Sequence, residues 1–209
     1  MALTTLPANA FVDDAITSDK INLANNFAFT GTVSGAGTWV LLNTTTVNGQ
    51  SRISFSSSLI TSSYKTYVIR GIGISMSTDG TAYGLDISEN NGSSYPSTNS
   101  MARENFYDDT FRITRQTSAE TILIASSLDG DNSNSNGTLS FDLYCFNMAD
   151  TANYKNFYWT QAQTDQSGVA STIRNGCATH QSNSAVNNLS VRPINGTQTG
   201  GTLQLWGIA

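Results

Sequence analysis

The fold of this chain is indicated most clearly by residues 67–88, whose sequence is YVIRGIGISMSTDGTAYGLDIS. In the first half, Ile72, Ile74 and Met76 alternate with small residues, and in the second half large apolar residues again occupy every other position. Such alternation is typical of β-strands, whose successive side chains point to opposite faces. The Asp-Gly pair at 79–80 suits a tight turn, so this segment predicts a β-hairpin.

The same alternation recurs along the chain after residue 37. Residues 139–145 place their apolar side chains on one face, and the next run predicts Phe157 and Trp159 inside with Tyr158 outside. Further strands are expected in residues 53–55, 121–126, 169–173, 189–191 and 203–208. Roughly nine or ten short strands separated by turn residues predict an all-β domain, either a β-sandwich or a jelly roll.

Residues 1–37 have a different pattern. Their apolar residues are isolated and follow no period, and the segment ends in the glycine-rich run at 31–37. We therefore expect an extended N-terminal attachment arm, residues 1–37, followed by a β-sandwich domain, residues 38–209. The large apolar side chains of the arm are its candidate contacts with a partner: Leu6, Phe11, Ile16, Ile21, Leu23, Phe27 and Phe29.

The composition limits the class of partner. Charged residues make up only 12% of the chain, whereas Ser, Thr, Asn and Gln make up about two-fifths, far above the usual share. Uncharged polar groups cost less to desolvate than charges, so this surface suits packing against other copies or binding to glycans. The net charge of −5, with ten Lys and Arg spread singly, argues against a nucleic-acid partner.

No targeting or membrane segment is expected. No stretch of the chain approaches the length and apolarity of a membrane span, so a membrane is not an expected partner. The first twenty residues lack the basic start and continuous apolar core of a signal peptide. The chain is therefore expected to be made and kept in the cytoplasm, or assembled there.

The residue types needed for catalysis are sparse. His180 is the single histidine and lies in a stretch that predicts a loop, where it is expected to be solvated or hydrogen-bonded rather than to act as a base. The acidic pairs at 13–14 and 108–109 are adjacent in sequence, so the two side chains point to opposite sides of a strand. Two carboxylates brought together from distant strands stay open as an alternative. We therefore expect no catalytic residues, and we expect that the chain is not an enzyme.

No metal or cofactor is expected. Cys145 and Cys177 lack the spacing of a metal motif and are interpreted as small buried residues rather than a disulfide. Residues 129–134 alternate oxygen ligands as a calcium loop does, but Ser140 stands where a bidentate Glu is required, which favours a plain hairpin loop. Gly71 and Gly73 share a strand face and predict close packing there, by a ring, a backbone or a neighbouring copy.

The segments at residues 16–21, 27–35, 64–74, 88–95, 154–157 and 203–208 resemble parts of virion surface proteins of tailed marine bacteriophages, of the head-decoration and short-fibre type. Residues 16–21 and 27–35 resemble the opening of fibre-like and decoration-like proteins. Other segments resemble a β-domain that recurs in head- and tail-surface proteins: residues 64–74, 88–95, 154–157 and 203–208.

This resemblance implies a structural protein of the virion, attached through its arm and assembled in the host cytoplasm, with a distal β-sandwich and commonly a homotrimer. Its implied partners are the major capsid protein or another virion component, together with other copies of the chain. A capsid decoration or cement protein is expected. The alternative is a tail-fibre or receptor-binding module that recognises host surface glycans. The resemblance transfers no catalytic residues.

Overall fold

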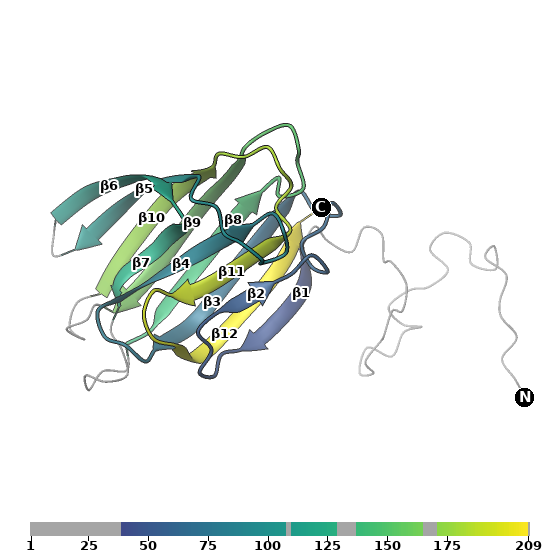
Figure 1. The fold of residues 1–209 in the computed structure, drawn as a ribbon. Coiled ribbons are helices and arrows are strands. Elements are labelled where there is room, and N and C mark those ends of the chain that lie inside the picture. The colour runs from purple at the N-terminus through teal and green to yellow at the C-terminus, as the bar shows by residue number, and fades with distance from the viewer. Residues whose placement is uncertain (1–38, 108–109, 129–136, 165–170, 209) are drawn as a thin grey trace, which may run out of the picture. The chain divides into compact units, whose positions relative to one another are not determined.

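The computed structural model describes residues 39–107, 110–128, 137–164 and 171–208. Within these residues twelve strands form two antiparallel sheets and no helix occurs, which confirms the predicted all-β fold (Figure 1). The strands are β1 (Trp39–Thr46), β2 (Ile53–Phe55), β3 (Thr66–Met76), β4 (Thr81–Ser88), β5 (Asn99–Tyr107), β6 (Thr110–Ala119), β7 (Thr121–Leu128), β8 (Leu139–Phe146), β9 (Lys155–Thr164), β10 (Ser171–His180), β11 (Asn188–Pro193) and β12 (Gln198–Ile208).

The two sheets pack face to face as a β-sandwich. The larger sheet has eight strands in the order β1-β12-β3-β8-β9-β10-β5-β6, and the smaller has four in the order β2-β11-β4-β7. Figure 1 shows the four-stranded sheet in front of the eight-stranded sheet. Between them lies one apolar core, in which burying each large side chain contributes about 2 kcal/mol. Its largest fully buried members include Phe55, Tyr67, Tyr83, Phe157 and Trp159.

The predicted hairpin in residues 67–88 is wrong, although both of its strands form. β3 pairs with β12 and β8 in the larger sheet, whereas β4 pairs with β11 and β7 in the smaller one. The turn at 77–80 therefore carries the chain from one sheet to the other. Alternation identifies the apolar face of each strand but not its neighbour. Here the two sheets meet across the core, where Tyr83 of β4 and Phe141 of β8 have ring centroids 5.7 Å apart.

Ile72 points away from the core, contrary to the prediction, because β3 contains a bulge. Gly73 has a positive φ of 60°, and the register with β8 shifts between Gly71 and Ile74. The extra residue changes the parity, so Ile74 is buried while Ile72 is 48% exposed on the opposite side. The close packing expected at Gly71 and Gly73 is confirmed only at Gly71, where the ring of Phe141 lies at the place of a Cβ. It is wrong at Gly73, which has open space beside it. Gly71 therefore faces the core and opens no surface to another copy.

The predicted facing of residues 157–159 is confirmed. Phe157 and Trp159 are buried, and Tyr158 between them is 45% exposed on the other side of β9. The strand count is higher than expected because β1, β5 and β6 were not predicted. β5 and β6 have the sequences NSMARENFY and TFRITRQTSA, whose many polar and charged residues hide the alternation.

Several predictions fall outside the described residues. The arm at 1–37 is one of them, together with its seven candidate contacts Leu6, Phe11, Ile16, Ile21, Leu23, Phe27 and Phe29. The acidic pairs at 13–14 and 108–109 and the oxygen-rich loop at 129–134 are the others.

Candidate functional site

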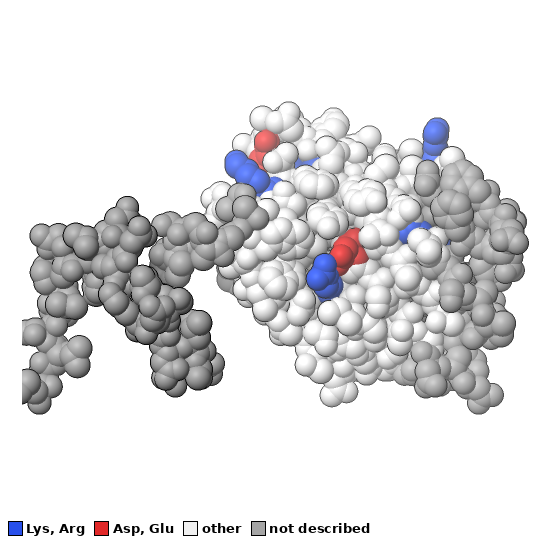
Figure 2. All heavy atoms as spheres, turned by 180° about the vertical axis from the view of Figure 1, so that it is seen from behind, with Lys and Arg blue, Asp and Glu red and all other residues white. Residues whose placement is uncertain are grey.

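The face of the eight-stranded sheet turned away from the core, here called the outer face, carries most of the large apolar side chains that remain exposed. They come from strands along the whole width of the sheet: Trp39, Leu41, Ile72, Ile113, Tyr158 and Ile173. Figure 2, which views the molecule from behind Figure 1, shows that charged side chains on this side are sparse. Large exposed apolar surface on a folded protein marks a place of interaction.

One line of residues across the outer face is aromatic, and we call it the aromatic row. The strand registers place Trp206, Val68, Tyr144 and Tyr158 side by side on β12, β3, β8 and β9. Tyr144 lies 6.2 Å from Tyr158 between ring centroids, and Trp39 lies 6.2 Å from Trp206 and 6.5 Å from Tyr144. Val68 is fully buried although it points away from the core, so its aromatic neighbours form a continuous apolar layer.

The next line of residues is hydrophilic, and we call it the polar row. Gln204, Arg70, Asp142, Thr160 and Asn175 are in register on five neighbouring strands, β12, β3, β8, β9 and β10. On β12, β3, β8 and β9 this position is two residues from the aromatic row, a separation of about 7 Å along a strand. The polar row therefore runs parallel to the aromatic row across the middle of the sheet.

An ion pair stands at the centre of the polar row. Arg70 donates from Nε to Asp142 Oδ1 at 2.7 Å and from Nη2 to Oδ2 at 2.9 Å. The hydrogen bond to Asp142 raises the pKa of Arg70 above its ordinary value. Both side chains stay open to solvent, at 40% and 27% exposure. Because each charge is matched by the other, the pair offers hydrogen-bonding groups without a net charge.

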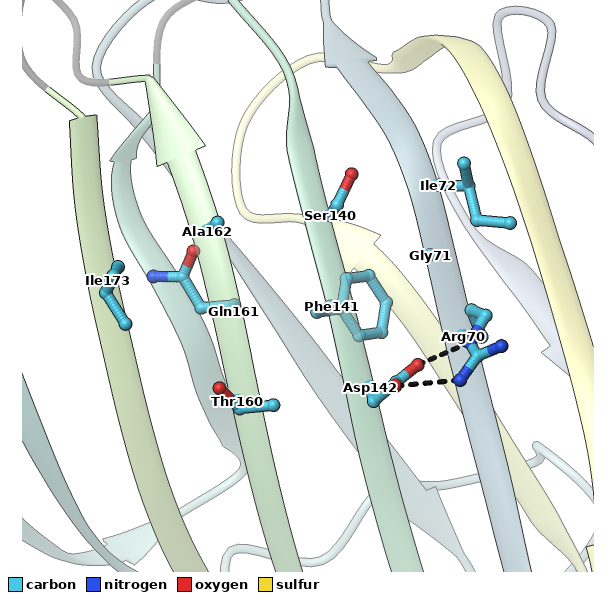
Figure 3. A pocket seen from close by; sticks show the side chains of 10 residues that line it. All are labelled: Arg70, Gly71, Ile72, Ser140, Phe141, Asp142, Thr160, Gln161, Ala162 and Ile173. Carbon is cyan, nitrogen blue, oxygen red and sulfur yellow. Dashed lines mark hydrogen bonds and ion pairs between the residues drawn. The ribbon is translucent and has the colours of Figure 1, made fainter.

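Hollows lie on both sides of β9. One of about 440 Å³ is lined by Arg70, Ile72, Asp142 and Thr160, with Ile173 at its far side. Figure 3 shows Asp142 and Arg70 joined by two bonds beside Ile72, while Thr160 and Ala162 lie on the neighbouring strand. A second hollow, of about 470 Å³, is lined by Ala102, Ile113, Arg115, Tyr158, Asn175, Gly176 and Cys177. Both hollows are open to solvent, so the outer face has two shallow depressions over these strands.

The outward side of the four-stranded sheet, here called the small-sheet face, is built differently. Asp86 of β4 is fully buried and forms ion pairs with Arg192 Nε at 2.6 Å and Arg52 Nη2 at 2.7 Å. Thr121 also donates to Asp86, and the guanidinium of Arg52 lies 4.1 Å from the ring centroid of Tyr95. The carboxylate of Asp86 is therefore matched by guanidinium groups of the same face, while Nη1 of Arg52 is buried without a hydrogen-bond partner.

The position of His180 differs from the one that the sequence predicts. It is the last residue of β10 rather than a loop residue, and it is fully buried rather than solvated. Its Nδ1 lies 2.8 Å from Asn99 Oδ1 and its Nε2 lies 3.0 Å from Glu89 Oε1. Both ring nitrogens are thus engaged by protein oxygens, so the hydrogen-bonded part of the expectation holds. The contacts tie the end of β10 to β5 and to the loop after β4.

Glu89 and Lys155 complete the polar contacts at this end of the sandwich. Burial raises the pKa of Glu89, but hydrogen bonds from Ser182 and His180 outweigh it, so that the pKa lies below its ordinary value. Burial lowers the pKa of Lys155, whose Nζ donates to the carbonyls of Asn153 at 2.8 Å and Ser182 at 3.3 Å. These groups hold loops together.

The two cysteines differ. Cys145 is buried as predicted, and burial raises the pKa of its thiol. Cys177 is exposed on the outer face, next to Tyr158 in register, so its predicted burial is wrong. Both are free thiols. They lie on β8 and β10, two strands apart, with their side chains on opposite faces of the same sheet.

No protein-family model, curated protein or solved structure matches this chain. In the described part of the chain, no three His, Cys, Asp or Glu side chains are grouped to hold a metal ion. Nor do those residues include a helix long and apolar enough to cross a membrane.

The outer face itself was not predicted from the sequence, except for the outward Tyr158. Its Arg70–Asp142 pair joins residues 72 positions apart, which alternation alone does not connect.

Proposed function

We propose that this chain is a structural protein of a tailed-phage virion, a capsid decoration or cement protein, and not an enzyme. The observation that carries the proposal is how the polar groups of the sandwich are used. The buried side chains of Asp86, His180 and Lys155 hold strands and loops together, while the exposed apolar groups gather on one broad outer face. This arrangement supports a role in binding and assembly.

The sequence supports the particular assignment to a virion. The segments that resemble phage surface proteins include residues 64–74, most of which lie in β3, and residues 203–208, which lie in β12, the strand paired with β3 in the large sheet. A surface rich in Ser, Thr and Asn, with 12% charged residues, suits close packing on a particle. In this proposal the protein is assembled onto the virion in the host cytoplasm.

The proposed partners follow from the two parts of the chain. Residues 1–37, through Phe27, Phe29 and the other apolar side chains of the arm, attach the protein to the major capsid protein or another virion component. The sandwich associates with other copies, because a chain with few charges has little electrostatic protection at its sheet edges, and the resemblance to phage surface proteins favours a homotrimer. Light scattering on the full-length chain is expected to give three times the 22.3 kDa of one chain.

The position of the protein in the particle tests the proposal. Heads and tails of the purified virion are separated, and the copy number of the chain in each is measured by mass spectrometry. A high copy number on heads is expected. A matched binding experiment compares the full-length chain with a chain that begins at Gly37: both should show a cooperative thermal transition, and only the first should bind heads. Recovery of the chain from tails alone contradicts the decoration role.

The alternative is a tail-fibre or receptor-binding module. The observation that favours it is the open outer face, where aromatic and hydrogen-bonding side chains stand side by side. Recovery from tails in a few copies per particle supports this alternative over the decoration role.

A further inference from the structure

We infer that the outer face binds a polysaccharide with uncharged repeats, which lies across the strands along the polar row. This inference concerns the ligand of one surface. It holds for a protein on the head or on the tail, and it does not depend on the virion assignment.

The spacing of the polar row suits a chain of sugars. Five neighbouring strands each present one hydrogen-bonding side chain, in the order Gln204, Arg70, Asp142, Thr160 and Asn175. Neighbouring strands lie about 4.8 Å apart, so these groups recur at a regular interval close to the length of one sugar ring. Hydroxyl groups both donate and accept, and the row offers amides, a hydroxyl, a guanidinium and a carboxylate to meet them.

The aromatic row supplies the apolar half of such a site. Sugar rings have apolar faces made of C–H groups, which pack against aromatic side chains. Tyr158 is 45% exposed beside the polar row, and Tyr144 and Trp206 continue the aromatic surface onto β8 and β12. The hollows on either side of β9 receive the parts of the ligand that project toward the sheet. A ligand along this line meets apolar and polar groups at once.

The position of the charges distinguishes this ligand from a protein. The centres of protein interfaces are depleted of charged residues, and the polar groups lie at the rim. Here the Arg70–Asp142 pair and Thr160 stand on β3, β8 and β9, in the middle of the eight-stranded sheet, with apolar groups on both sides. The pair has no net charge, which suits a ligand without charge, and the cation of Arg115 stands apart from the polar row, on β6 at the second hollow.

The test begins with the full-length protein on an array of bacterial capsular and O-antigen polysaccharides, with neutral and acidic repeats represented. The strongest neutral binder is then titrated in solution while tryptophan fluorescence is recorded. Trp39 and Trp206 lie at the aromatic row, whereas Trp159 is buried in the core. Binding is therefore expected to change the fluorescence of the exposed tryptophans. Failure to bind any polysaccharide of the array overturns the inference.

Two variants and one control locate the site. Tyr158→Ala removes an aromatic platform and Asp142→Asn removes the carboxylate of the polar row, and each is expected to weaken binding about tenfold or more. Tyr154→Ala is the control, because Tyr154 is 51% exposed but lies in the loop before β9. It should bind as the wild type does. All variants are first checked for an unchanged thermal transition.

The remaining outcomes also decide the inference. Unchanged binding in both outer-face variants overturns it, because the polysaccharide then binds elsewhere. If the variants lose no polysaccharide affinity but instead lower the mass of the protein in solution, the outer face is an interface between copies. Preference for acidic polysaccharides alone contradicts the neutral ligand. The location of the protein in heads or tails is measured separately, so either proposal can fail without the other.

Discussion

The two outward sides of the sandwich use the same kinds of side chain in opposite ways. On the small-sheet face, Asp86 is fully buried and binds both Arg52 and Arg192. On the outer face, Asp142 is 27% exposed and binds Arg70, which is 40% exposed. One carboxylate is enclosed by its own chain, and the other is left where a ligand can reach it.

This difference shows which face is available for binding. A buried carboxylate that holds two guanidinium groups has its hydrogen-bonding capacity filled, and breaking its contacts would leave charges without partners. A partly exposed pair beside the aromatic row contributes little to folding and keeps groups free for solvent or ligand. The small-sheet face therefore serves stability, and the outer face is the candidate for function.

The largest expected effect is a loss of stability when the ion pairs of the small-sheet face are broken. Asp86→Ala leaves Arg52 and Arg192 without their shared partner and is expected to lower the free energy of unfolding by about 3 kcal/mol. The equivalent change on the outer face, Asp142→Ala, is expected to cost less than about 1 kcal/mol because the pair is exposed. Urea unfolding of both variants measures the difference. Equal losses would contradict the contrast between the faces.

The next effect compares the two sides of the eight-stranded sheet on two neighbouring strands, β10 and β9. Gly176 of β10 faces the core, where a Cβ would overlap the ring of Trp159. Gly176→Ala is therefore expected to destabilise the protein by about 2 kcal/mol through overpacking. Thr160→Ala, on the outward side of neighbouring β9, should change stability by less than about 0.5 kcal/mol. Thermal unfolding of the two variants provides the comparison, and a tolerated Gly176→Ala would show that the core is loosely packed there.

A smaller effect depends on pH and lies at the end of the sandwich. Hydrogen bonds keep the pKa of Glu89 below its ordinary value of 4.5, so the unfolded state binds more protons as the pH falls below that value. The stabilisation is complete above pH 4.5 and is lost as the pH falls through the folded-state pKa. Glu89→Gln should flatten this part of a stability profile measured between pH 6 and 3. An unchanged profile would show that Glu89 does not contribute to the pH dependence of stability.

The smallest effect leaves the fold unchanged and concerns only the access of a thiol reagent to the two cysteines. Cys177 on the outer face is expected to react with a thiol reagent in the native protein, whereas Cys145 is buried and has a raised pKa. One thiol should titrate before denaturation and two after it. Cys177→Ser, as the control, should remove the native reaction. A native reaction that persists in this variant would mean that the core opens to the reagent.

Local alternation was sufficient to predict many strands and their buried sides. Residues 139–145 and 157–159 showed it plainly, because each apolar side chain that faces the core occupies every other position. It failed where an extra residue changed the parity, as at Gly73, and where polar residues dominate, as in β5 and β6. A bulge is a matter of how two strands pair, and a single strand carries no clear sign of it.

The sequence by itself determined the class of this protein: a charge-poor chain with alternating apolar residues can bury them only by pairing strands into sheets. Only the tertiary structure decided which strands pair, because pairing depends on residues far apart along the chain. It turned the expected 67–88 hairpin into a connection between sheets and placed His180 in a buried network with Glu89. It also set Arg70 beside Asp142 and next to the aromatic row, since register across five strands brings together residues that no local pattern connects.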